Sequence, residues 1–161
     1  MKLKTMHACL LASGLALPVL ASESPAPASS DSGIYASAAQ LASELKGSVA
    51  SHNDPALASV GVTPQYAIHE VHREKAGPPA VHDDSTELHF ILEGHAIFVT
   101  GGKIEKHGSE QVITGGTERA VQAGDAVIVP AGTPHWYRQI DAPLSYLEVR
   151  FVTRAATVPQ H

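Results

Sequence analysis

The sequence contains a single cysteine among its 161 residues, and this scarcity excludes several kinds of site. Cys9 lies in a mostly apolar run over residues 8–20, close to the N-terminus. One cysteine cannot form an intramolecular disulfide, and if that run is removed, the rest of the chain has no thiolate ligand or nucleophile. Any metal or catalytic chemistry must then come from other side chains, among which the ten histidines stand out.

Positive charge is also scarce, with 11 Lys and Arg residues against 16 Asp and Glu residues and a net charge of −5. An acidic chain is repelled by the phosphate backbone, so we expect no nucleic-acid partner. After residue 21 no run is long and apolar enough to cross a bilayer. We therefore expect no membrane association once the N-terminal run is removed.

The N-terminus is typical of a secretory signal peptide. Lys2 and Lys4 precede the apolar run, and the small residue Ala21 is followed by polar residues. This pattern predicts a signal peptide over residues 1–21, and hence a periplasmic or extracellular protein. Residues 22–33, rich in Ser, Pro and Ala, are expected to form a disordered linker, which leaves enough chain for one domain.

A short helix is predicted ahead of the main domain. Ser37 and Gln40 have the spacing of a capping box, and Leu41 and Leu45 follow at helical intervals. We expect a helix over residues 38–46, ending near Gly47, that covers a barrel mouth or an edge strand. Residues 51–64 are interpreted as a loop, so residues 34–64 form a helix-and-loop segment.

From Tyr66 onward the sequence consists of short β-branched or aromatic runs separated by Gly, Pro and Asp. Eight strands with no helical pattern between them indicate an all-β jelly roll or small barrel over residues 65–153, followed by a C-terminal tail over residues 154–161. The expected strands cover residues 66–72, 87–93, 95–100, 111–114, 119–122, 126–130, 136–140 and 145–152.

Two segments carry more specific patterns than the strands. The first has the spacing H-x4-E-x6-G, formed by His82, Glu87 and Gly94. The second has the spacing G-x5-P-x-G-x2-H, which begins at Gly124 and ends at His135. In the second segment a Gly-Asp turn should start a strand, and the following Pro and Gly should turn the chain so that His135 begins the next strand with its ring inside the barrel.

These segments resemble the two sequence motifs of the cupin superfamily, in the right order. The resemblance implies a cupin-type jelly-roll β-barrel with a short N-terminal helix, and it places His82, Glu87 and His135 at metal-ligand positions. The first motif departs from the usual pattern, because metal-binding cupins have a further histidine two residues before His82, where this chain has Ala80. One of the four usual ligands is therefore absent.

Two imidazoles and one carboxylate suit one divalent ion such as Fe, Mn, Ni or Zn, and three protein ligands leave open positions for water or substrate. The alternative is a cupin that has lost its metal. Against that alternative, a glutamate buried in a barrel is costly without a cationic partner.

His89 and Tyr137 are the candidate catalytic residues. His89 shares a strand face with Glu87 by alternation, so it either supplies a fourth ligand, acts as acid and base beside the metal, or is a hydrogen-bonded core histidine. Tyr137 shares the face of His135 and could bind a substrate oxygen, although a barrel aromatic is often core. His69 or His72 could replace the missing ligand, but both are expected at a surface or edge.

The last strand has an apolar face and a polar face, and alternation does not say which one points inward. The polar face carries Tyr146, Glu148 and Arg150. If it faces the lumen, Arg150 could bind a carboxylate; otherwise it lies at the surface or in a dimer contact.

The function expected from the resemblance is a metal-dependent cupin that acts on or binds a small oxygen-rich molecule, such as an organic acid, a sugar or a related metabolite. A dioxygenase, decarboxylase, isomerase or lyase would each fit the fold. The alternatives are a non-catalytic small-molecule-binding cupin, with or without metal, and a structural metal that only stabilises the barrel. A homodimer is expected by resemblance alone.

Overall fold

The computed structural model describes residues 33–153. The predicted signal peptide (residues 1–21), the predicted linker apart from Gly33, and the predicted tail (residues 154–161) lie outside the described residues. Within the described range, the one helix is too short and too polar to cross a bilayer.

The N-terminal helix, α1 (Ala38–Ala50), begins where the sequence predicts. Ser37 caps it, because its hydroxyl accepts a hydrogen bond from the backbone of Gln40 while the Gln40 side chain accepts one from the backbone of Ser37. The helix does not end near Gly47 but continues to Ala50. It packs on β1, the edge strand of a sheet, as expected, and the buried residues Ala56 and Ala58 belong to that strand.

Ten strands follow the helix within residues 33–153, and they include all eight that the sequence predicts. Their bounds are β1 (Ala56–Val62), β2 (Tyr66–Arg73), β3 (Ser85–Glu93), β4 (His95–Thr100), β5 (Lys103–His107), β6 (Glu110–Thr114), β7 (Thr117–Gln122), β8 (Ala126–Val129), β9 (His135–Ile140) and β10 (Leu144–Val152).

The two additional strands are β1 and β5. The expectation of a loop over residues 51–64 is wrong, because β1 occupies its centre and pairs with β2. Small residues and a glycine hide the strand pattern of β1, and its stability comes from pairing and from the helix above it. The β5 strand pairs only with β6, in a two-stranded hairpin.

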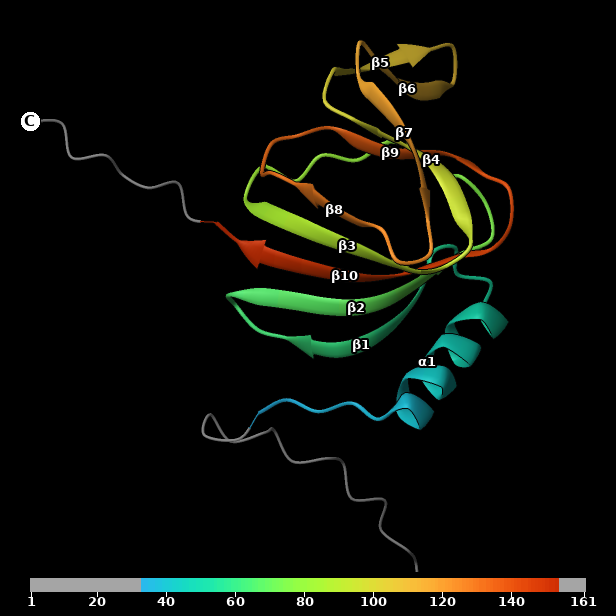
Figure 1. Cartoon of the computed structure of the whole chain (residues 1–161), viewed down its shortest axis with the longest axis vertical. Coiled ribbons are helices and arrows are strands. Elements are labelled where there is room, and N and C mark those ends of the chain that lie inside the picture. The colour runs from blue at the N-terminus through green and yellow to red at the C-terminus, as the bar shows by residue number, and fades with distance from the viewer. Residues whose placement is uncertain (1–32, 154–161) are drawn as a thin grey trace, which may run out of the picture. The chain divides into compact units, whose positions relative to one another are not determined.

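The strands form two main antiparallel sheets (Figure 1). The larger sheet has the order β1-β2-β10-β3-β8, and the smaller one has the order β7-β4-β9. Chain neighbours β3 and β4 belong to different sheets, as do β9 and β10, so the chain passes repeatedly between the sheets. This is the jelly-roll arrangement that the sequence predicts.

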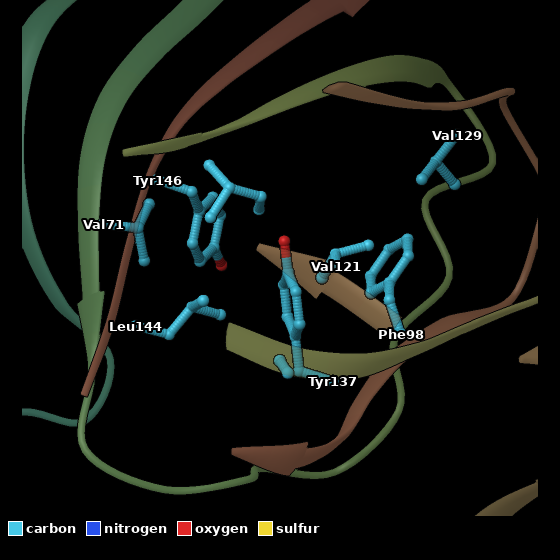
Figure 2. Packing of buried hydrophobic residues seen from close by; sticks show 9 residues of the cluster. Val71, Phe98, Val121, Val129, Tyr137, Leu144 and Tyr146 are labelled. Atoms are coloured by element: carbon cyan, nitrogen blue, oxygen red, sulfur yellow. The ribbon is translucent and has the colours of Figure 1, made fainter. Parts of the chain in front are cut away.

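The core lies between the two sheets. Ile91 and Tyr146 come from the larger sheet and Phe98 and Tyr137 from the smaller one, and each is at most 5% exposed. Figure 2 shows the hydroxyl groups of Tyr137 and Tyr146 pointing into the space between the sheets. The two phenols thus bring polar groups into the apolar cluster.

The first motif ends on a glycine for a steric reason. Gly94 joins β3 to β4 with a φ of 82°, and a Cβ there would clash with the carbonyl oxygen of Pro143. Only glycine fits such a conformation against another backbone segment.

Candidate metal centre

Three predicted ligands meet between the two sheets. Glu87 lies on β3, His135 is the first residue of β9, and His82 lies in the segment before β3. Nε2 of His82 is 3.3 Å from Oε1 of Glu87, and Nε2 of His135 is 3.3 Å from Oε2 of the same carboxylate. The ligand atoms of all three residues lie within 4.8 Å of one another.

These separations fit one bound ion. Ligands about 2.1 Å from a metal lie about 3.0 Å apart in octahedral and about 3.4 Å apart in tetrahedral coordination. The two nitrogen–oxygen distances fall within that range, and the ligand atoms of His82 and His135 lie within 4.8 Å of each other, so the three side chains are close enough to hold one ion. His82 is 33% exposed while Glu87 is 1% exposed, so the centre is open on the His82 side.

The hydrogen bonding of His135 prepares it as a ligand. Its Nδ1 lies 3.2 Å from the carbonyl oxygen of Thr133, which can only accept, so Nδ1 carries the proton. Burial lowers the pKa of His135, and the contacts with the Thr133 carbonyl and Glu87 offset this only in part. The neutral ring therefore directs the lone pair of Nε2 toward the carboxylate of Glu87.

The substitution of the fourth ligand by alanine leaves the backbone of the site intact. Ala80 and His135 form an antiparallel bridge, with both backbone hydrogen bonds at 2.9 Å. In addition, Nε1 of Trp136 donates to the carbonyl oxygen of Gly77 at 2.6 Å. The segment before His82 is thus held against β9, although it presents a methyl group where the motif has an imidazole.

Arg150 faces the lumen, which answers the question that alternation left open. Its Nε donates to Oε1 of Glu87 at 2.9 Å, and its Nη2 lies 3.2 Å from Oε1 of Glu148 and 3.3 Å from Nε2 of His82. The carboxylates that Arg150 binds are therefore the chain's own. A guanidinium already provides the cationic partner that the sequence argument assigned to a metal.

The carboxylate of Glu87 is held in its ionised form. Burial by itself would raise its pKa, but the hydrogen bond with His89, the charge of Arg150 and, when they are protonated, the charges of His135 and His82 outweigh burial and bring the pKa to about 2. The group is thus an anion at neutral pH, as a metal ligand must be.

His89 forms hydrogen-bonding contacts through both ring nitrogens. Its Nε2 is 3.1 Å from Oε2 of Glu87, and its Nδ1 is 3.0 Å from the hydroxyl of Tyr137. It belongs to a second possible ligand group, with Glu87 and Glu148, which shares only Glu87 with the first. The two contacts fit the interpretation of His89 as a hydrogen-bonded interior histidine with Tyr137 as its direct partner, and the group with Glu87 and Glu148 fits its interpretation as a ligand.

His69 and His72 belong to neither ligand group. Nδ1 of His69 lies 3.2 Å from the hydroxyl of Ser59, and His72 lies 3.0 Å from both Ser145 and Glu74. Neither histidine replaces the ligand lost at Ala80.

A small pocket of about 90 Å³ opens beside the centre, and His82, His89, His135, Tyr137, Glu148 and Arg150 contribute to its wall. A larger hollow of about 800 Å³ lies over β4 and β7 and contains none of the predicted site residues. Chemistry rather than size identifies the smaller pocket as the site. Its wall also includes Arg73, which the sequence analysis did not single out because alternation on β2 does not reveal the inner face.

Comparison with solved structures gives matches of low identity. A protein of Thermus thermophilus is 20% identical over 62% of this chain and 84% of its own, with a TM-score of 0.48. A cupin superfamily protein of Desulfitobacterium hafniense is 14% identical over 63% and 80%, with a TM-score of 0.46. A predicted oxalate decarboxylase of Thermotoga maritima is 17% identical over 54% and 66%, with a TM-score of 0.42.

No curated protein sequence matches this chain. The model of the cupin domain family, however, matches residues 67–150, which include both motifs and every residue of the centre. The fold agrees with that match, since it is mostly β with one N-terminal helix. This chain therefore belongs to the cupin domain family.

Proposed function

We propose that this protein is a metal-dependent cupin that binds one divalent ion through His82, Glu87 and His135 and acts on a small oxygen-rich molecule in the adjoining pocket. The observation that carries the proposal is the convergence of two imidazole nitrogens on one buried carboxylate, each at 3.3 Å. A divalent ion held there would supply Lewis-acid or redox chemistry. The ion is expected to be Fe, Mn, Ni or Zn.

The surrounding residues have separate tasks in this proposal. His89 and Tyr137 form a hydrogen-bonded chain that ends on Glu87, which fixes the carboxylate and offers a route for a proton. Glu148 would keep its contact with Arg150 if a bound metal took the place of Arg150 at Glu87. The segment held by Trp136 covers part of the pocket and limits the access of water.

A binding protein without metal is the second candidate, and the contacts of Arg150 favour it. In that case the guanidinium permanently neutralises Glu87, and the pocket captures a ligand without turnover. The two candidates differ in whether a metal ion can displace the guanidinium.

Elemental analysis of the purified protein separates the candidates. We expect about one equivalent of a divalent metal, and a loss of more than about 100-fold in metal affinity for His82→Ala, Glu87→Gln and His135→Ala. His107→Ala removes an exposed imidazole on β5 and serves as the control, with unchanged metal content.

Each outcome has a distinct meaning. Metal-free protein that also fails to take up any of the four metals on titration rejects the metal proposal and leaves the binding protein. Metal that remains bound in all three site variants places the ion elsewhere. Turnover that disappears with Glu87→Gln, while ligand affinity persists, indicates an enzyme rather than a binder.

We also propose that the chain is exported, on the strength of the N-terminal pattern. Mass spectrometry of the protein recovered from the native host should find a chain that begins at Ser22. An intact N-terminus in a cytoplasmic fraction would reject export.

A further inference from the structure

The positive charge of Arg73 has no ion-pair partner among the residues that the structure describes. It is the last residue of β2, and it lines the pocket of the candidate centre. Its Nε donates to the hydroxyl of Tyr146 at 3.0 Å, and its guanidinium carbon lies 5.9 Å from the centre of the Tyr137 ring. Both contacts orient the group, and neither neutralises it.

Within residues 33–153, no carboxylate lies within ion-pair distance of Arg73, and its two terminal nitrogens make no hydrogen bond to protein. Arg150, on the same pocket wall, differs because it contacts both Glu87 and Glu148. The pocket thus contains one neutralised guanidinium and one that is positioned but free.

From this difference we infer that the pocket takes a small organic anion, whose carboxylate is bound by Arg73 and whose second oxygen reaches the metal centre. The inference rests on the proposed function and narrows its substrate class. A guanidinium has several N–H donors in one plane that match the two oxygens of a carboxylate. A neutral sugar would remove water from the guanidinium of Arg73 without supplying an anionic partner, and this desolvation costs free energy.

The charge of the whole pocket supports an anion. Arg73 and Arg150 balance Glu87 and Glu148 before any ion binds. A divalent metal then leaves the wall with excess positive charge, which an acid anion offsets. The pocket is small, at about 90 Å³, so the ligand has only a few carbon atoms.

Malonate is a suitable probe, because it carries one carboxylate for Arg73 and one for the metal, and malonamide is its uncharged counterpart. Calorimetric titration of metal-loaded protein should show that malonate binds at least about 10-fold more tightly than malonamide. In Arg73→Met the malonate affinity should fall about 10- to 100-fold, with malonamide affinity unchanged. Arg73→Lys should recover part of the loss.

Arg119→Met is the matched control, because Arg119 is exposed, makes no ion pair within the described residues and lies on β7, away from this pocket. It should bind malonate like the wild-type protein. Metal content is measured before and after each titration, so that removal of metal by malonate is not counted as binding.

Equal malonate affinity in the wild-type protein and Arg73→Met, or no preference for malonate over malonamide, would overturn the inference. Absence of metal would instead overturn the proposed function, and the metal content is measured before malonate is added. The same titrations are then made on metal-free protein, where Arg73→Met must still weaken malonate binding.

Discussion

Nε of Arg150 lies 2.9 Å from Oε1 of Glu87, so the buried carboxylate at the centre of the site has a cationic partner within its own chain. The two residues are directly opposed on β10 and β3. A metal at this centre must compete with the guanidinium for the carboxylate. This competition leads to the first prediction.

Replacing Arg150 by methionine should destabilise the metal-free protein by about 1–3 kcal/mol. Breaking a fully buried ion pair costs about 3–5 kcal/mol, and the loss is smaller here because Arg150 is 32% exposed. In Glu87→Gln/Arg150→Met the loss should be less than the sum of the single changes, because the buried charge of Glu87 is no longer left unpaired. Urea denaturation measures all three variants, and additive losses would show that the pair is not coupled.

Removing the imidazole of His89 should lower stability without removing the metal. His89→Leu leaves the hydroxyl of Tyr137 and one oxygen of Glu87 without their partner, which costs about 1–3 kcal/mol. Tyr137→Phe removes only one hydrogen bond and should cost about 1 kcal/mol. Metal content and urea denaturation are measured together; loss of the ion in His89→Leu would make His89 a ligand.

Alkaline pH should unfold the protein through its interior phenols. Burial raises the pKa of Tyr146 to about 12, although Arg73 lowers it and Glu148 and Glu87 raise it further. Burial also raises the pKa of Tyr137. A raised folded-state pKa means that this stabilisation is complete below about pH 10, the ordinary value for tyrosine, and is lost as the pH rises toward 12.

For Tyr146 alone the stabilisation lost over this interval is about 3 kcal/mol. Absorbance at about 295 nm measures tyrosinate. The ionisation step near pH 10 should be equally large in the wild-type protein and in Tyr146→Phe, because Tyr146 does not ionise at that pH. A step that is present in the wild-type protein and lost in Tyr146→Phe would contradict this prediction. Such a step would mean that the phenol is accessible to water and that the interior is less closed than the contacts indicate.

Two glycines of the motifs should differ in their tolerance of alanine. Both have positive φ, but a Cβ on Gly124 meets nothing within 4 Å, whereas one on Gly94 meets the backbone of Pro143 and Leu144. Gly124→Ala should therefore cost about 1–2 kcal/mol, and Gly94→Ala about 3–5 kcal/mol. Thermal denaturation compares the two variants directly. Equal losses of stability would show that the loop at Pro143 moves away from the added Cβ at little cost.

Sequence by itself indicated the fold class, and the resemblance of its two motifs to those of cupins singled out His82, Glu87 and His135. Alternation along β3 places Glu87 and His89 on one face, and the Gly and Pro positions of the second motif turn the chain so that His135 begins β9. These are local constraints of dihedral angle and strand period, which can be read residue by residue.

Tertiary structure alone decided how the charges in the lumen pair. Period-two alternation divides β10 into two faces but does not say which one is buried, so the contacts of Arg150 with Glu87 and Glu148 could not be predicted. The same limit hid Arg73, and the small residues of β1 hid a strand that pairing and α1 stabilise. Which carboxylates meet which guanidinium depends on contacts between segments far apart in sequence, and no local pattern encodes them.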